Sequence, residues 1–341
     1  MKAAVLRGPR QLSIEDVSEP APPGPSEVTI AVSHAAVCGT DAGEWHHGSR
    51  LTVPPVILGH EFAGEVVAVG LNVGRFAPGD RVVSGAGVNC GECDWCRSGR
   101  TNLCSTYRTL GLELDGGLAQ FVNAPDSTLL RVPDHLSFEQ AALAQPFAVA
   151  IHAVKRSGVQ PGETCVVIGI GGIGAFIVAA AAARGADLIA VDIDDARLNT
   201  ARRLGAARAV NVAGQDLAEA IRRAADRDGP HVVIEASGVA HGPAAALAAV
   251  RRGGRVLLVG LQSAPRELDL LSLTVREIEL TSTLAHVLAD DLSDALELLG
   301  STSVFDEVVE KVIPLDQLVD EGLLPLAEGR AGGKIIVDVR G

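Results

Sequence analysis

Apolar and polar residues follow two different rhythms along the chain. Up to about residue 148, short apolar runs either alternate with polar residues, as in 28–32, or are bounded by Gly, Pro and Asp, as in 65–69 and 81–83. Alternation with a period of two is typical of strands that are buried on one face. The N-terminal part of the chain is therefore predicted to be mainly β.

From residue 149 to 286, apolar runs alternate with Ala-, Leu- and Arg-rich segments of helical length. One such segment, 195–204, begins with the acidic residue Asp195 and is followed by Gly205, a common helix stop. Apolar runs separated by helices predict a doubly wound parallel sheet, and hence an α/β domain. The six predicted strands are 165–168, 188–191, 209–212, 232–234, 256–259 and 278–281.

The last segment, 287–341, offers a helix over 291–299 and strands over 308–313 and 334–339. It has no core of its own, so we expect it to fold back onto the N-terminal domain. A chain of 341 residues agrees with two domains, because single cores usually stop growing at about 250 to 300 residues.

The composition indicates a globular protein whose partners are small molecules. Apolar residues make up 47% of the chain, aromatic residues only 3%, and the formal net charge is -13. Without a block of Lys or Arg, this charge disfavours nucleic acids and anionic membranes as partners. Charges at Arg7, Arg10 and Glu15 interrupt the N-terminus, so no secretory signal is predicted and the expected location is the cytoplasm.

One uncharged run, 164–183, is nominally long enough to span a bilayer. Four glycines between positions 169 and 174 interrupt it. A strand, a glycine turn and the start of a buried helix explain the same run without lipid.

The glycines of this run form a dinucleotide-binding pattern. Gly169, Gly171 and Gly174 fit G-x-G-x-x-G between an apolar strand and an Ala-rich helix, and Asp192 ends the next predicted strand. Backbone N–H groups at the helix start would hold a pyrophosphate, and Asp192 would hold the adenosine ribose and repel a 2′-phosphate. NAD is therefore predicted over NADP. The predicted contacts here are Gly169, Gly171, Gly172, Ile173, Gly174, Asp192 and Arg197, with a solvated arginine as the alternative for the last.

Four cysteines lie close together in the N-terminal part. Cys90, Cys93, Cys96 and Cys104 follow C-x2-C-x2-C-x7-C. Thiolates at this spacing can converge on one tetrahedral ion, and four sulfurs leave no open position for a substrate, so a structural zinc is predicted. Disulfides and an iron–sulfur cluster are the weaker alternatives.

A second metal site is indicated by Cys38 and by the pair His60 and Glu61 about twenty residues later. A thiolate, an imidazole and a carboxylate could meet on one metal, and three protein ligands would leave the open position that a catalytic zinc needs. Separate core and surface roles are the alternative for these residues. The remaining cysteine, Cys165, is predicted to be a buried small hydrophobe.

In combination, these motifs resemble the zinc-dependent medium-chain alcohol dehydrogenases, in the branch with sorbitol, threonine and butanediol dehydrogenases. The resemblance extends over essentially the whole chain and implies a GroES-like β-barrel catalytic domain over 1–148, with a structural zinc lobe over about 88–106. It further implies a Rossmann NAD-binding domain over 149–286 and a C-terminal segment, 287–341, that returns to the catalytic domain. A homotetramer is implied, with a dimer as the alternative.

The resemblance also implies residue roles. Cys38 and His60 become ligands of a catalytic zinc, and Glu61 is either a third ligand or a mobile carboxylate beside the metal. Asp41 would hold the other ring nitrogen of His60, and Thr40 would take the substrate proton. Zinc would lower the pKa of the alcohol, whose hydride would pass to the nicotinamide. Further predicted cofactor contacts are Gly260, Leu261 and Ser282.

Two positions depart from the pattern of this branch. Gln145 stands where the branch often has Glu. A neutral amide at this position would leave the metal a stronger Lewis acid. Gln145 either binds the metal, directly or through water, or merely lines the pocket. Gly43 stands where many relatives have a histidine that passes the proton to solvent. We expect His46, His47 or water to replace it, with exposed loop histidines as the alternative.

The sequence thus predicts an oxidoreductase that uses NAD and two zinc ions, one catalytic and one structural, to interconvert a secondary alcohol or polyol and its ketone. One alternative is a zinc-free quinone or enoyl reductase of the same superfamily, which would not need Cys38, His60 or the four-cysteine lobe. Another is a non-catalytic dinucleotide-binding sensor, which would not need an open metal site. Trp45, Phe147 and residues 284–287 are candidate pocket walls, with core packing as the alternative.

Overall fold

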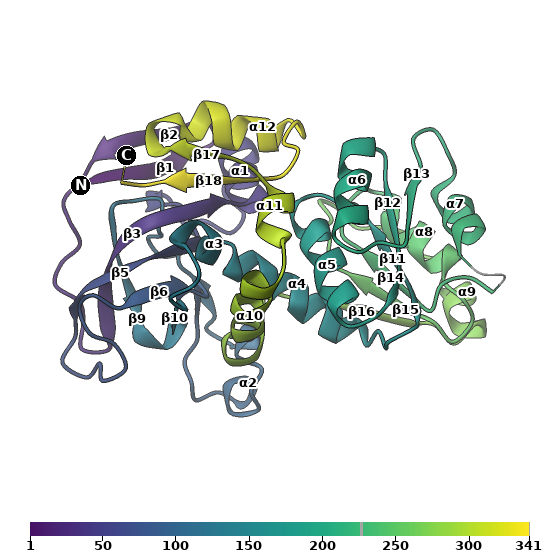
Figure 1. Cartoon of the computed structure of the whole chain (residues 1–341), viewed down its shortest axis with the longest axis horizontal. Coiled ribbons are helices and arrows are strands. Elements are labelled where there is room, and N and C mark those ends of the chain that lie inside the picture. The colour runs from purple at the N-terminus through teal and green to yellow at the C-terminus, as the bar shows by residue number, and fades with distance from the viewer. Residues whose placement is uncertain (226–227, 341) are drawn as a thin grey trace. The chain divides into compact units, whose positions relative to one another are not determined.

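The computed structural model describes residues 1–225 and 228–340 (Figure 1). These residues form two compact units. Unit 1 comprises Met1–Ala148, Val287–Phe305 and the described residues from Val309 onward, and unit 2 comprises Val149–His286 and Asp306–Val308. The boundary after Ala148 falls inside the helix α4 (Ala144–Ser157), so one continuous helix belongs to both units.

A large mixed sheet is the centre of unit 1. Its strands are β3 (Glu27–Val37), β5 (Glu61–Val69), β6 (Arg81–Ser84), β9 (Phe121–Pro125), β10 (Leu129–Arg131), β17 (Val309–Pro314) and β18 (Lys334–Asp338). The strand order is β10-β6-β5-β3-β18-β17, and β9 also pairs with β3. Along the first half of β3, the apolar residues Val28, Ile30 and Val32 are buried and alternate with less buried positions, as the sequence pattern predicts.

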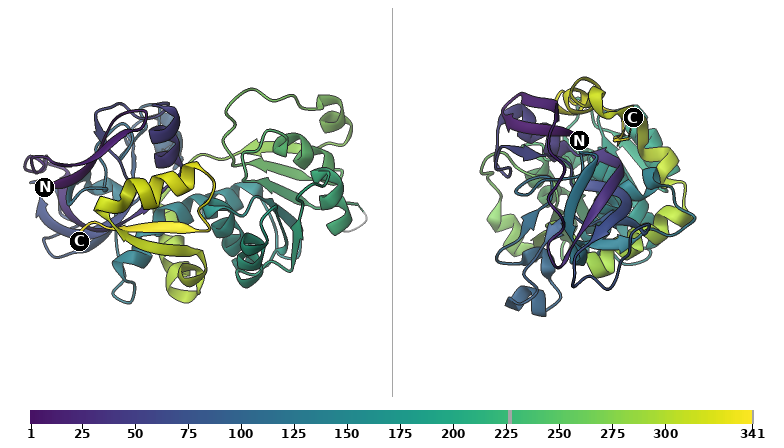
Figure 2. Two further views of the ribbon diagram at one scale, coloured as in Figure 1. Left: turned by 90° about the horizontal axis from the view of Figure 1, so that it is seen from above. Right: turned by 90° about the vertical axis from the view of Figure 1, so that its left-hand side faces the viewer.

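The C-terminal strands complete this sheet. Strand β18 pairs antiparallel with β3, so that Ile335 lies opposite Val37 and Asp338 lies opposite His34. Both views in Figure 2 show the yellow C-terminal ribbon beside the purple N-terminal strands of the same unit. The second half of β3, from Ser33 to Val37, is buried at every position.

Smaller elements surround the sheet of unit 1. The remaining strands and helices are β1 (Lys2–Gly8), β2 (Gln11–Asp16), α1 (Gly39–His47), β4 (Val56–Ile57), β7 (Gly87–Val88), α2 (Asp94–Arg97), β8 (Arg108–Thr109), α3 (Phe138–Ala142), α10 (Ser293–Ser301), α11 (Val304–Val308, shared with unit 2) and α12 (Leu324–Ala327). The helix predicted over 291–299 begins two residues later, at Ser293, because a π-helical turn, Leu288–Leu292, precedes it.

Unit 2 is built on a parallel sheet. Its strands are β11 (Thr164–Ile168), β12 (Asp187–Asp192), β13 (Arg208–Asn211), β14 (Val232–Glu235), β15 (Arg255–Leu258) and β16 (Glu279–Ser282). The order β13-β12-β11-β14-β15-β16 is the order 3-2-1-4-5-6 of a doubly wound dinucleotide-binding sheet. The ends of each predicted strand are correct to within one residue, so the predicted α/β fold class is confirmed.

Helices lie on both sides of this sheet (Figure 1). They are α5 (Gly172–Ala183), α6 (Asp195–Arg203), α7 (Leu217–Ala224), α8 (Gly242–Ala249) and α9 (Leu270–Val275). Because helices cover both faces, the central strand β11 is buried at all of its positions. Cys165 in β11 is fully buried, as predicted.

The uncharged run 164–183 forms β11, the glycine turn and α5. Among the described residues, no helix combines the length and the apolar character that a membrane crossing requires.

Candidate metal centres and cofactor site

Cys38 lies where β3 ends and α1 begins. It is the N-cap of α1, and its backbone N–H donates a 2.9 Å hydrogen bond to Asp41 Oδ2 in the first turn. An acidic side chain three residues after the N-cap commonly closes a helix start in this way. The Cys38 thiol is therefore held at the N-terminus of α1. The mainly β prediction for this part of the chain missed α1.

Cys38, His60 and Glu61 form a three-donor cluster. Each offers one ligand atom, and these atoms lie within 4.8 Å of one another. The sheet creates this proximity, because β3 and β5 are neighbours and Ala36 lies opposite Glu61. Sulfur, nitrogen and oxygen donors at this separation fit a zinc ion with a position left open.

Asp41 contacts His60, one of the three donors of this cluster. The Asp41 carboxylate is fully buried, and its Oδ1 lies 3.4 Å from His60 Nδ1. An acid in this place fixes the orientation of a ligating imidazole. Burial lowers the pKa of His60, but the charges of Asp41 and Cys38 outweigh this and raise it well above its usual value. A metal that binds His60 therefore has to displace a proton.

Lys334 is the residue of this site that the sequence analysis missed. Its Nζ donates hydrogen bonds to Glu61 Oε2 and, over 3.2 Å, to the backbone oxygen of Val37. Burial lowers the pKa of Lys334, but the charges of Glu61 and Cys38 more than compensate and raise it. At the start of the apolar run KIIVD, the lysine gave no signal of a site. Only the pairing of β18 with β3 brings it there.

Three residues predicted to carry the proton lie on α1. Thr40 is partly buried in the first turn, whereas His47 is exposed at the last position. His46 faces Arg10, whose Nη2 lies 3.2 Å from the imidazole nitrogens. Desolvation and the positive charges of Arg10 and His47 lower the pKa of His46. Around Gly43, the described atoms leave a Cβ free space to 4 Å.

The predicted fourth-ligand residue and the predicted pocket walls differ in how deeply they are buried. Gln145 is buried in the first turn of α4, and its role at the metal stays a prediction. Trp45 belongs to the hydrophobic core of unit 1, and Phe147 is almost fully buried, which agrees with the core-packing alternative. Leu284, in unit 2, is exposed, whereas His286 is buried.

The four remaining cysteines of unit 1 surround one point. The Sγ–Sγ distances are 3.5 Å for Cys93–Cys96 and for Cys90–Cys104, and 4.0 Å for Cys90–Cys96. A tetrahedron of sulfurs about 2.3 Å from a zinc ion has edges of about 3.8 Å, whereas a disulfide needs about 2.0 Å. All four thiols are free of disulfides. Their positions fit the predicted structural zinc.

Thiolate formation is favoured at one cysteine of this lobe and opposed at another. Hydrogen bonds from the backbone N–H groups of Ser105 and Cys96 lower the pKa of Cys93 to about 6, whereas burial raises the pKa of Cys96 to about 12. The lobe has little apolar packing, since α2 buries none of its residues and the Arg100 guanidinium lies over the exposed Trp95 ring. A bound metal would therefore be the main interaction that stabilises this loop.

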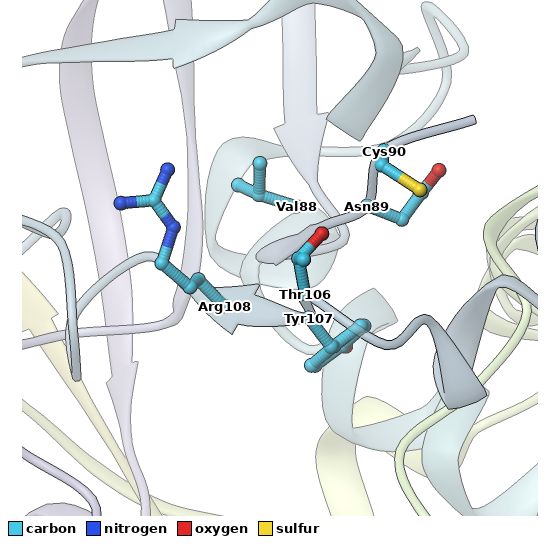
Figure 3. A pocket seen from close by; sticks show the side chains of 6 residues that line it. All are labelled: Val88, Asn89, Cys90, Thr106, Tyr107 and Arg108. Atoms are coloured by element: carbon cyan, nitrogen blue, oxygen red, sulfur yellow. The ribbon is translucent and has the colours of Figure 1, made fainter. Parts of the chain in front are cut away.

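A surface cavity of about 440 Å³ lies beside the four-cysteine lobe (Figure 3). Val88, Asn89, Cys90, Thr106, Tyr107 and Arg108 line it. Figure 3 shows Arg108 and Cys90 on opposite sides of the opening. Because Cys38, His60 and Glu61 do not line it, we do not assign the predicted catalytic centre to this cavity.

The predicted cofactor residues of unit 2 gather at one edge of its parallel sheet. Gly169 follows β11, Asp192 ends β12, Gly260 lies just after β15 and Ser282 ends β16. The carboxyl ends of parallel strands share an edge, which is where ligands bind in doubly wound sheets. Leu261 is 79% exposed beside Gly260. Arg197 lies on α6 and is partly buried.

Three glycines of the turn differ in what a Cβ at their position would meet. Gly169 has a φ of 87°, and a Cβ there would lie 2.6 Å from Ser237 Cβ. A Cβ on Gly174 would overlap the carbonyl oxygen of Gly169, so this glycine lets α5 pack closely against the turn. Around Gly171, which has an ordinary φ of -74°, no described atom lies within 4 Å of a Cβ. Its open side is where a pyrophosphate could approach the backbone.

Backbone groups fix the orientation of Asp192. Its Oδ2 accepts a 2.6 Å hydrogen bond from the N–H of Ile170, and its Oδ1 accepts from the N–H groups of Ile193 and Asp194 at 2.7 and 3.0 Å. The carboxylate therefore connects the glycine turn to the end of β12. This arrangement holds one negative charge beside the position expected for the adenosine ribose.

Glu235 is a second residue that the sequence analysis missed. It ends β14 fully buried, and its Oε1 accepts hydrogen bonds from the N–H groups of Ser237 at 2.9 Å and Gly238 at 3.0 Å. A Cβ on Gly260 would lie 2.7 Å from Glu235 Oε2. The Glu235 carboxylate thus orders the turn after β14, and its backbone oxygen accepts a 2.9 Å hydrogen bond from the N–H of Gly260 in the loop after β15. The strand was predicted to end at residue 234, and the carboxylate inside the turn gave no further signal.

The fold and these sites define a zinc-dependent dehydrogenase with a dinucleotide-binding domain, and comparisons with known proteins agree. The family described as Alcohol dehydrogenase GroES-like domain matches residues 24–134, and the family described as Zinc-binding dehydrogenase matches residues 172–301. The sorbitol dehydrogenase of Bacillus subtilis (strain 168) is 40% identical over 77% of this chain and 76% of its own length. The L-threonine 3-dehydrogenase of Anaeromyxobacter dehalogenans (strain 2CP-C) is 33% identical over 92% of each chain.

A solved structure extends the likeness to the whole fold. The 2R,3R-butanediol dehydrogenase of Bacillus subtilis superimposes with a TM-score of 0.91, covers 99% of each chain and is 30% identical. The chain belongs to the zinc-containing medium-chain alcohol dehydrogenase family. It is therefore a zinc-type oxidoreductase that acts on alcohols or polyols.

Two glycine substitutions should separate folding from cofactor binding. Gly174→Ala should destabilise unit 2 by roughly 1–3 kcal/mol, because its methyl group overlaps the Gly169 carbonyl. Gly171→Ala should leave the melting temperature nearly unchanged but weaken NADH binding, because the methyl group enters the open side of the turn. Thermal melts without cofactor and fluorescence titration with NADH measure the two effects. Unchanged NADH affinity in Gly171→Ala would place the pyrophosphate elsewhere.

Proposed function

We propose that this protein oxidises a secondary alcohol or polyol to the ketone with NAD, using a catalytic zinc held by Cys38, His60 and Glu61. One observation carries the proposal: the chain has a three-donor cluster in addition to its closed four-sulfur site, and only the former leaves a coordination position for a substrate. The relatives named as sorbitol, L-threonine and butanediol dehydrogenases support a substrate with a secondary hydroxyl.

When bound, zinc supplies the positive charge that makes an alcohol easier to deprotonate. The chain's own residues perform the remaining tasks. Asp41 contacts Nδ1 of His60 and orients its ring. Thr40, two residues after Cys38 on α1, would accept the hydroxyl proton of the substrate. The glycine turn and Asp192 would hold the nicotinamide cofactor that receives the hydride.

Two cysteine substitutions distinguish this function from its alternatives. Cys38→Ser should lose one of two zinc ions and reduce turnover by more than roughly 100-fold, since even mutations around a metal's ligands cost 10–100-fold. Cys104→Ser should lose the other zinc and lower the melting temperature, because the lobe has little apolar packing to replace the metal. Elemental analysis, NADH formation from an alcohol panel and thermal melts provide the measurements.

The metal content also tests each rival class. One zinc per chain in the parent, together with full turnover in Cys38→Ser, would support a zinc-free reductase of the same superfamily. Two zinc ions with no turnover on any alcohol or ketone would support a cofactor sensor.

We propose NAD rather than NADP as the cofactor because the carboxylate of Asp192 is held in place by three backbone N–H groups. A fixed negative charge there repels a 2′-phosphate. Asp192→Asn should raise the ratio of kcat/KM for NADP to that for NAD by at least about tenfold, equivalent to about 1.4 kcal/mol. Asp216→Asn is the matched control, because it removes a charge from unit 2 while keeping an N-cap for α7. An unchanged ratio in Asp192→Asn would contradict the assignment.

We further propose His47, rather than His46, as the group that passes the proton to solvent. On α1, His47 lies seven residues after Thr40 and four after Gly43, so these three positions share one face of the helix. The span along the axis is about 10 Å, so water must connect Thr40 to His47. His46 is instead engaged with Arg10.

The pH dependence of turnover tests the relay. His47→Ala should lower turnover mainly below neutral pH, where the proton is hardest to release, and His46→Ala should leave the profile nearly unchanged. Imidazole in the buffer should restore the His47→Ala enzyme. A profile that neither substitution alters would assign the relay to water alone.

The homotetramer, with a dimer as the alternative, stays a prediction. Two features of unit 2 support association. Strand β16 is an edge of the described parallel sheet, and the nearby Leu270, Leu271 and Val275 are exposed apolar side chains.

A further inference from the structure

Three ionisable side chains of unit 1, those of Lys334, Glu61 and Asp41, are buried together beside the partly buried Cys38. Lys334 and Glu61 form an ion pair whose side chains are only 7% and 2% exposed. Cys38 and the buried Asp41 lie beside them, and both act on the Lys334 ammonium electrostatically. Three neighbouring strands supply the group, since β3 stands between β5, which begins at Glu61, and β18, which begins at Lys334.

A divalent metal balances the charges of this group. With the metal bound, His60 is a neutral ligand, the Cys38 thiolate, Asp41 and Glu61 carry three negative charges, and Lys334 carries the single positive side-chain charge. Buried charge is stable only when it is compensated nearby. A divalent zinc together with Lys334 gives neutrality, and Gln145 adds no charge.

The ammonium also occupies part of the donor set. Glu61 Oε2 accepts a hydrogen bond from Lys334 Nζ, which donates to Val37 O as well. This second bond anchors the ammonium to the residue directly before Cys38. One Glu61 oxygen is thus committed to Lys334 while the carboxylate still belongs to the three-donor cluster.

We propose that Lys334 is a positioning residue that shares the Glu61 carboxylate with the catalytic zinc, keeping Glu61 from becoming a full ligand and holding the zinc less tightly than the donors alone would. The inference rests on the proposed function, in which Cys38, His60 and Glu61 hold that metal.

The sign of the effect follows from Coulomb's law. A fixed positive charge beside a cation site weakens binding of the cation. The same charge favours loss of a proton from the alcohol, because it stabilises the negative charge that remains. Removing the Lys334 charge should therefore tighten zinc binding and raise the pKa that controls turnover. A lysine that merely joins β18 to β5 would not produce this combination.

Zinc release from the loaded protein tests the proposal. Lys334→Met should release the catalytic zinc to a colorimetric chelator on the order of tenfold more slowly than the parent, an effect of the size that groups around metal ligands exert. Lys334→Arg should stay within about twofold of the parent, since it keeps the charge. The matched control is Lys311→Met on β17, which removes a partly exposed lysine paired with Glu321.

The four-cysteine zinc is the internal reference in this experiment. Cys38→Ser protein, which keeps only that zinc, gives its release trace. If the parent holds one zinc, or if Cys38→Ser removes no release phase, the proposed function fails. If both phases are present but Lys334→Met releases the catalytic zinc as fast as the parent or faster, the role of Lys334 fails and the proposed function survives.

A second background keeps the test open if Lys334→Met does not fold. Glu61→Gln leaves the ammonium unpaired beside the metal, whereas the double variant Glu61→Gln, Lys334→Met removes both charges and leaves no buried ion unpaired. Zinc should leave the double variant more slowly than Glu61→Gln, and the reverse order would overturn the proposal. Within whichever pair folds, the kinetic pKa of turnover should be higher in the member that lacks Lys334, by about one unit. An unchanged or lower kinetic pKa would also overturn it.

Discussion

The chemistry of unit 1 depends on the burial of charge at the ends of three neighbouring strands. Cys38 follows β3, Glu61 opens β5, and Lys334 opens β18. Isolated ions at these positions would cost several kcal/mol each, so they are tolerable only as a mutually compensating group. Asp41 serves this group twice, because one carboxylate oxygen closes the start of α1 and the other contacts His60. The same carboxylate therefore stabilises the start of α1 and contributes to the electrostatics of the metal site.

The two metal sites differ because their surroundings differ. The four-cysteine lobe is a loop with few buried side chains, and a closed set of sulfurs can hold it together without a core. The three-donor cluster instead lies on the sheet of unit 1, where strand pairing already fixes the backbone of Glu61 opposite Ala36. A site whose geometry the sheet supports can leave a coordination position free for a substrate.

Unit 2 achieves order at its cofactor edge with two buried carboxylates. Asp192 accepts hydrogen bonds from the glycine turn and from the loop after β12, and Glu235 accepts them from the turn after β14. These turns carry the backbone N–H groups of doubly wound sheets that meet a dinucleotide. Fixing them before the cofactor binds reduces the ordering cost of binding.

Much of this could be predicted from local pattern alone. The strands of unit 2 and the spacing of the four cysteines depend on periodicity and on neighbours in the sequence, so the chain determined by itself the doubly wound sheet and a convergent set of thiols. It also marked Cys38, His60 and Glu61 as donors. It did not determine which residue from a distant segment contacts these donors. Lys334 lies 273 positions from Glu61 along the chain and looks like the polar first residue of an apolar strand. Only the tertiary structure, by inserting β18 beside β3, decided that this ammonium is buried against Glu61, because an ion pair between distant segments depends on which strands become neighbours in the sheet, and no local pattern encodes that order.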